Sequence, residues 1–87
     1  MTIEQLSARS VIDWFRLIED LRGRSYSYRN IHALTGISIG SLTGYCNGGS
    51  PSHQHGEAII SLWLTATRRS RDDLPITTKQ LSASNVM

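Results

Sequence analysis

The stretch GISIGSLTGYCNGG, residues 36–49, decides which fold the sequence predicts. It holds five glycines in fourteen residues, and glycine-rich segments are usually loops, some of which bind phosphate. Its apolar residues nevertheless fall at Ile37, Ile39, Leu42 and Tyr45, a spacing that suits one face of a helix. The stretch is therefore a loop, a phosphate-binding loop or a helix whose outer surface carries little bulk.

Helix signals around this stretch favour two short helices joined by a turn. Ser27 is a suitable N-cap for a helix of about two turns, and Gly36 is a suitable residue to end that helix. Ser38 can then cap a second helix that runs from Ile39 to about Asn47. Two such helices joined by about three residues form a helix-turn-helix. The outer face of the second helix would have almost no bulk and no negative charge: Gly40, Ser41, Thr43, Gly44 and Asn47.

Two longer amphipathic segments, residues 10–22 and 53–69, flank this motif. The apolar stripe of the first is formed by Val11, Trp14, Phe15, Ile18 and Leu21. Gly23 follows it, and Arg68 and Arg69 fall in the last turn of the second, where a helix dipole favours cations. The tail after Pro75 fits a short strand, a short helix or a disordered segment. We predict an all-α fold, a compact bundle of about five short helices with a central helix-turn-helix. Residues 1–76 would form the domain, and residues 77–87 a polar tail that is either disordered or a dimerisation arm.

Length and composition limit the function classes. A chain of 87 residues buries roughly 60% of its unfolded surface, which leaves little room for a large active-site cleft. The single cysteine, Cys46, cannot form an internal disulfide, and the N-terminal MTIEQLSARS lacks the apolar core of a secretory signal. The longest apolar run, residues 59–66, is far shorter than a membrane helix requires. We expect a cytoplasmic protein that does not contact a membrane.

The charges are distributed unevenly along the chain. The formal net charge is only +2, but all seven carboxylates lie before residue 21 or after residue 56. The acid-free span holds the three histidines together with Arg22, Arg24 and Arg29. Such a segment would be attracted to a polyanion, although a gap of this length among so few acids can also arise by chance.

The run NIHALTGISIGSLTGYCNGGSP, residues 30–51, resembles the helix-turn-helix of the lambda-repressor-like domains found in phage and bacterial repressors of the Cro and cI type. The matching positions are Ile31, Gly36, Ile37, Ser38, Leu42, Tyr45, Asn47 and Gly48. The resemblance extends from about Val11 to Pro75. It implies a homodimer that binds double-stranded DNA sequence-specifically and regulates transcription, as the repressor of a phage or mobile element. His32 stands where the family usually has alanine, so either the helices pack more loosely or the imidazole has a partner.

The resemblance also implies roles for individual residues. Arg29, in the first turn of the motif, lies with Arg22 and Arg24 where this family contacts phosphates. The base-reading positions would be Ser38, Ile39, Gly40, Thr43, Gly44 and Asn47, which include no arginine or glutamine for a bidentate contact. Each of these residues also has a simpler explanation. Surface arginines often serve only to keep a protein soluble, and Asn47 followed by Gly48 is a favourable C-terminus for a helix by itself.

Other chemistries have weaker support in the sequence. Cys46, His53 and His55 match no zinc-ligand spacing, and neither a GxxxxGK[ST] nor a GxSxG pattern occurs. We therefore expect no metal, no cofactor and no enzymatic activity.

The segment 53–69 raises the question of a dimer, because it is apolar nearly all round. It is either a buried central helix or a two-fold contact through Ile60, Trp63 and Leu64. We favour the dimer, since small DNA readers gain affinity from paired half-sites. The alternative function is a protein-interaction module derived from a helix-turn-helix, such as a phage-encoded inhibitor of a host protein, with this helix as its contact.

Overall fold

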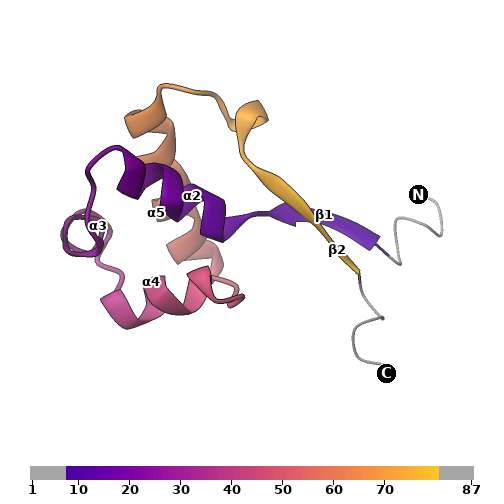
Figure 1. The fold of residues 1–87 in the computed structure, drawn as a ribbon, viewed down its shortest axis with the longest axis horizontal. Helices are drawn as coiled ribbons and strands as arrows, with labels where there is room; N and C mark the ends of the chain where they lie inside the picture. The colour runs from indigo at the N-terminus through magenta and orange to yellow at the C-terminus, as the bar shows by residue number, and fades with distance from the viewer. Residues whose placement is uncertain (1–7, 81–87) are drawn as a thin grey trace.

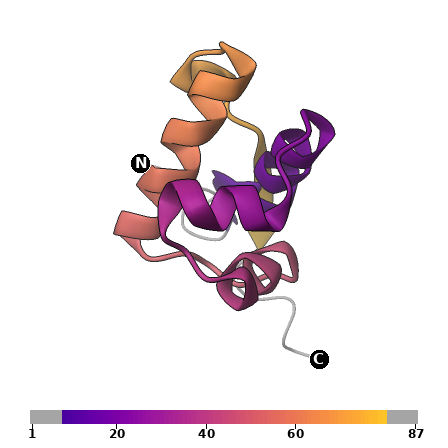
Figure 2. The ribbon, with the colours of Figure 1, turned by 90° about the vertical axis from the view of Figure 1, so that its left-hand side faces the viewer.

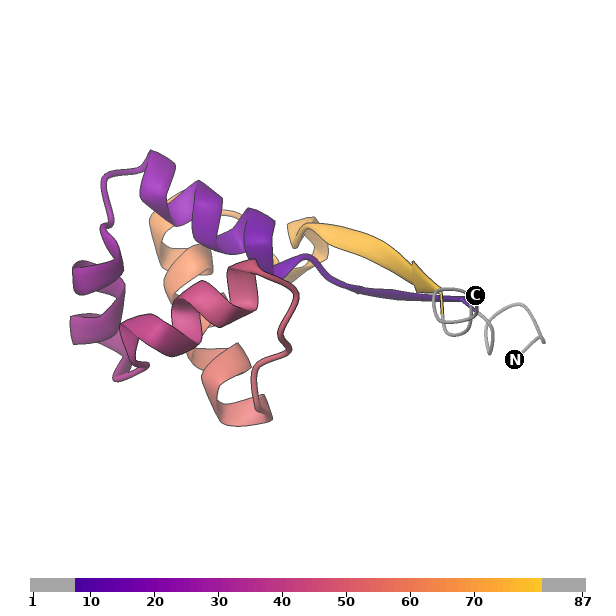
Figure 3. The same cartoon turned by 60° about the horizontal axis from the view of Figure 1, so that its bottom comes forward.

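The structure is a computed structural model that describes residues 8–80. Strand β1 (Ala8–Ile12) leads into α2 (Trp14–Gly23), α3 (Tyr28–Thr35), α4 (Ile39–Cys46) and α5 (His53–Thr67). A 3-10 turn, η1 (Arg71–Asp73), precedes strand β2 (Ile76–Gln80). The helices lie together, and the ribbon formed by the two strands extends away from them (Figures 1 and 3). The described chain is thus mostly helical, with a small two-stranded sheet.

The sheet corrects the all-α prediction. β1 and β2 are antiparallel, with Val11 opposite Thr77 and Ile12 opposite Ile76. The predicted helix from residue 10 begins only at Trp14, because the side chain of Asp13 caps it and the two β-branched residues before Asp13 pair as strand. Of the three alternatives for the tail, the strand is the correct one as far as Gln80, so residues 77–80 belong to the domain. The rest of the expected tail, residues 81–87, lies outside the described residues.

The predicted helix ends around the central turn are confirmed. The hydroxyl of Ser27 accepts from the Asn30 amide in a capping box, and the Ser38 hydroxyl accepts from the Ser41 amide. Gly36 ends α3 with φ of 79°, in the left-handed region that favours glycine. The far end of α5 differs from the prediction, because the helix stops at Thr67 and the two following arginines lie beyond it.

The core lies where α2 and α3 pack against α4 and α5, and Figure 2 shows α3 in front of the other helices. Its buried apolar side chains are Leu17, Ile18, Leu21, Ile31, Ile37, Leu42, Ile59, Ile60 and Trp63. The Trp63 indole N–H also donates to a carboxylate oxygen of Asp20 at 3.0 Å. Phe15, which the sequence assigned to the apolar stripe of the first helix, has an exposed side chain.

This core corrects the predicted dimer interface. Trp63 is 0% exposed and Ile60 only 3%, while Leu64 is half-buried. A residue enclosed by its own chain offers no surface to a second copy, so the apolar character of α5 reflects its central position in the domain. Within residues 8–80, no helix combines the length and apolar character needed to cross a membrane.

Candidate nucleic-acid interface

The outer face of α4 is open to solvent along its whole length. Each of the predicted base-reading residues is exposed: Ser38, Ile39, Gly40, Thr43, Gly44 and Asn47. The opposite side of α4 packs inward through Leu42, with Tyr45 and Cys46 half-buried beside it. We refer to the six exposed residues as the α4 face.

The two glycines of the α4 face are not required by packing. A Cβ atom built on Gly40 or Gly44 would meet nothing within 4 Å. By contrast, Gly48 has φ of 104°, and a Cβ on Gly49 would lie 3.0 Å from the carbonyl oxygen of Gly44. The exit glycines therefore serve the turn, whereas the glycines of the α4 face weaken a short helix by about 1 kcal/mol each without any steric need.

Two hydroxyl groups of this face are already engaged within the protein. Thr43 donates to the Ile39 carbonyl at 2.9 Å, and Ser38 donates to the Ser41 hydroxyl at 3.0 Å. Both oxygens retain lone pairs, so toward a ligand they act as acceptors. Asn47 caps α4 through its backbone N–H, and its exposed amide side chain retains both donor and acceptor groups.

The three predicted phosphate-binding arginines are all exposed but differ in their surroundings. The guanidinium of Arg22 lies 4.7 Å from the centre of the Tyr28 ring and 3.5 Å from a Glu19 carboxylate oxygen. Within the described part of the chain, no ion pair joins Arg24 or Arg29 to a carboxylate. Arg24 and Arg29 therefore carry charge that is free to meet an anion, and Arg22 is partly neutralised.

A contact between Tyr28 and Cys46 ties the beginning of α3 to the end of α4. The tyrosine hydroxyl and the cysteine sulfur are 3.6 Å apart. This hydrogen bond, helped by partial burial, raises the pKa of Tyr28 above its ordinary value, while the nearby Arg22 acts in the opposite direction. The hydroxyl is therefore protonated at neutral pH, and the relative placement of the two helices is fixed at this point.

The turn between α3 and α4 is held by a small polar network that the sequence did not reveal. The Nδ1 of His32 lies 2.9 Å from the Ile37 carbonyl oxygen, which can only accept, so this nitrogen carries the proton. The Thr35 hydroxyl donates to the Ile31 carbonyl and accepts from the Ile37 amide at 3.2 Å. Of the two expectations for His32, the structure shows the one in which the imidazole has a partner.

The other histidines and the cysteine are placed apart from one another. The ring nitrogen Nδ1 of His55 is 2.8 Å from the Tyr45 hydroxyl, which joins α5 to α4. Cys46 faces Tyr28, and His53 is exposed at the first position of α5. Among residues 8–80, no group of three histidine, cysteine or acidic side chains is arranged to hold a metal ion.

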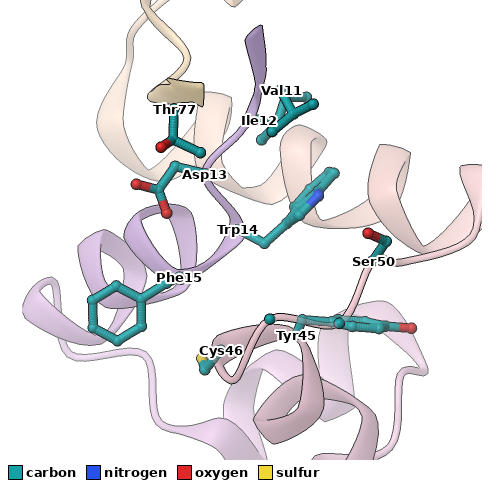
Figure 4. A pocket seen from close by; sticks show the side chains of 11 residues that line it. Val11, Ile12, Asp13, Trp14, Phe15, Tyr45, Cys46, Ser50 and Thr77 are labelled. Atoms are coloured by element: carbon teal, nitrogen blue, oxygen red, sulfur yellow. The ribbon is translucent and has the colours of Figure 1, made fainter. Parts of the chain in front are cut away.

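A cavity of about 270 Å³ separates the start of α2 from the loop that follows α4 (Figure 4). Trp14 and Tyr45 lie on two sides of it, with Phe15 and Thr77 near its edge. Sequence reasoning missed this cavity, because most of its lining comes from two segments, residues 11–15 and 45–50, that are far apart in the sequence.

Comparisons with protein-family models, with curated proteins and with solved structures found no significant match.

Proposed function

We propose that this protein binds double-stranded DNA, with α3, the turn and α4 acting as a helix-turn-helix of the lambda-repressor-like type. In this proposal α4 enters the major groove, and the protein is a transcription regulator of the phage or mobile-element repressor type. The observation that carries the proposal is the α4 face, whose six residues are all exposed and which is almost free of bulk and without a carboxylate. Arg29, at the start of α3, provides a free cation for the adjoining phosphates.

The phosphate contacts are proposed at the N-terminus of α3. There the amide of Asn30 is already bonded to the Ser27 hydroxyl, while those of Tyr28 and Arg29 have no partner within the described residues. Free amides at a helix N-terminus bind anions, and the Arg29 side chain would add a charge-assisted hydrogen bond. Arg24 would make a second contact, and Arg22 a weaker one because Glu19 competes for it.

The proposed base contacts follow from which hydrogen-bonding groups are free. The Thr43 oxygen can accept from the amino group of cytosine or adenine, and Asn47 can make a bidentate contact to adenine. The Ile39 side chain, exposed at the start of α4, suits contact with a thymine methyl. We therefore expect an operator whose contacted bases are mainly adenine, thymine and cytosine.

A homodimer remains part of the proposal but requires another interface, because Ile60 and Trp63 are buried. The exposed apolar side chains of Phe15 and Ile76 lie where the ribbon joins the helices. Each strand of the ribbon also has one edge that is unpaired within the described residues. A two-fold contact at this end of the molecule would present two α4 faces to two half-sites.

A salt titration of binding to a DNA duplex tests the proposal. A dimer with about six phosphate contacts should lose roughly a thousandfold in affinity between about 50 and 200 mM salt. Arg29→Ala should weaken binding to all duplexes alike and reduce the salt dependence, whereas Asn47→Ala should change the preference at one base position. Arg69→Ala, which removes an exposed arginine beyond α5, is the charge-matched control and should change neither. Absence of binding at low salt would refute the proposal.

The engaged hydroxyls of the α4 face favour a second candidate function. With few side chains to read bases, the same surface would suit a protein-interaction module, such as a phage-encoded inhibitor of a host protein. Since Ile60 and Trp63 of α5 are buried, the contact would be the α4 face itself. Binding to a protein but to no duplex, abolished by bulky substitutions at Gly40, would support this candidate over DNA.

A further inference from the structure

The side of α3 that faces away from α4 carries an exposed leucine between two hollows. Leu34 is 62% exposed. On one side of it lies a hollow of about 390 Å³, bordered by Arg24, Tyr26 and Ala33. On the other side a hollow of about 340 Å³ is bordered by Ala58 and Leu62 of α5. We call Leu34 with these two hollows the Leu34 surface, and Figure 2 views the molecule from the end where α3 lies beside α5.

Apart from Arg24, which is also a proposed phosphate contact, the Leu34 surface is separate from the proposed DNA contacts. Successive residues of an α-helix are about 100° apart, which places Leu34 about 140° from Arg29 and about 160° from His32 around the axis of α3. His32 is bonded to the turn that leads into α4, and Leu34 borders a hollow with α5. A partner on the Leu34 surface would therefore leave the α4 face open.

The lining of the Leu34 surface indicates the chemistry of its partner. Its residues are apolar, small or uncharged apart from Arg24, and no carboxylate borders either hollow. Ala33, Ala58 and Ser61 allow a close approach on both sides of the leucine. An apolar side chain seated next to Leu34 and a carboxylate placed against Arg24 would complement this arrangement.

A second copy of this chain does not provide that complement. A two-fold contact between two Leu34 surfaces would place two Arg24 side chains in the same interface. Because no carboxylate is among the lining residues, these positive charges would not be neutralised. Nucleic acid does not fit either, because its phosphates offer nothing to an exposed leucine. The geometry points to a docking site for an amphipathic, acidic protein segment, which carries apolar anchors on one side and aspartate or glutamate beside them.

This site is tested by selection from a random peptide library displayed on phage, with the full chain as bait and the Leu34→Ala variant as counter-selection. We expect the enriched peptides to combine apolar anchors with acidic residues. A synthetic copy of one such peptide, measured by fluorescence anisotropy, should bind about tenfold more weakly to Leu34→Ala and to Arg24→Glu. Replacing its acidic residues by lysine should restore binding to Arg24→Glu and weaken binding to the unaltered chain.

Ile76→Ala is the matched control, because Ile76 is as exposed as Leu34 but lies on β2. It should leave peptide binding unchanged, and circular dichroism should show that every variant is folded. Failure to enrich Leu34-dependent peptides, or enrichment of basic ones, would overturn the inference. The site does not depend on the proposed DNA binding: Leu34→Ala should not alter DNA affinity, and Arg29→Ala should not alter peptide affinity.

Discussion

Replacing both glycines of the α4 face by alanine separates what α4 needs for folding from what its surface does. Because a Cβ at Gly40 or Gly44 meets nothing within 4 Å, the two substitutions introduce no clash. Alanine favours a helix over glycine by about 1 kcal/mol per residue, so the double variant should gain about 2 kcal/mol of unfolding free energy. For a domain of this size that raises Tm by roughly 8–16 °C, which thermal unfolding followed by circular dichroism would measure.

The same double variant should lose DNA affinity if α4 lies against a groove. The added methyl groups would stand between the helix backbone and the bases, and overpacking of a close interface costs about 1–3 kcal/mol. That cost corresponds to a complex roughly 5- to 150-fold weaker in fluorescence anisotropy with a duplex. Thr65→Ala on α5 is the control: it should raise stability by about 0.5 kcal/mol through helix propensity and leave DNA binding unchanged.

The two measurements refute different parts of this reasoning. A double variant that is no more stable than the parent would contradict the helical conformation of α4 at these glycines. A stabilised variant with unchanged DNA affinity would show that the α4 face was not kept bare to approach a groove.

Three further predictions concern the helices and the turn. Gly56→Ala should lower stability by about 1 kcal/mol despite its better propensity, because the new Cβ would lie 3.1 Å from the ring of Trp14; a stabilised variant in urea unfolding would contradict this packing. His32→Ala should cost about 1 kcal/mol by removing the bond to the Ile37 carbonyl, whereas an unchanged midpoint would indicate that the turn does not need it. The pKa of Tyr28 in the folded protein is raised above its ordinary value of 10.0. The protonated hydroxyl therefore contributes to folding stability in full below about pH 10, and this contribution is lost as the pH rises through the folded-state pKa. Tyr28→Phe should accordingly flatten the fall in stability above pH 10, and an unaltered pH profile would exclude this tyrosine as its cause.

The parts of the fold that the sequence predicted are those fixed by neighbouring residues. Ser27, Gly36 and Ser38 mark their helix ends through contacts within a few positions, and the structure places those ends as predicted. The pairing of β1 with β2 joins segments at opposite ends of the described chain, and no local pattern predicts it. Val11 was assigned to a helix for this reason, since its apolar side chain suits a strand equally well.

The candidate site also has parts that the sequence predicts and parts that it does not. The exposure of Gly40, Thr43 and Asn47 followed from the spacing of the apolar residues on the other side of α4. The hydrogen bond from the Thr43 hydroxyl to the Ile39 carbonyl depends on the rotamer of Thr43, which the sequence does not specify. The error at Trp63 had another origin: in a small domain, a helix that is apolar all round is either the centre of the core or an interface, and composition alone does not distinguish the two.

The ribbon also has a consequence for the order of folding. Its strands lie at opposite ends of the described chain, whereas α3, the turn and α4 are close neighbours in sequence. Closing a long loop costs more entropy than closing a short one and slows the contacts that depend on it. The helices should therefore assemble before β1 meets β2, including during synthesis, when β2 is the last described element to leave the ribosome. The proposed reading helix would then be in place before the chain closes its sheet.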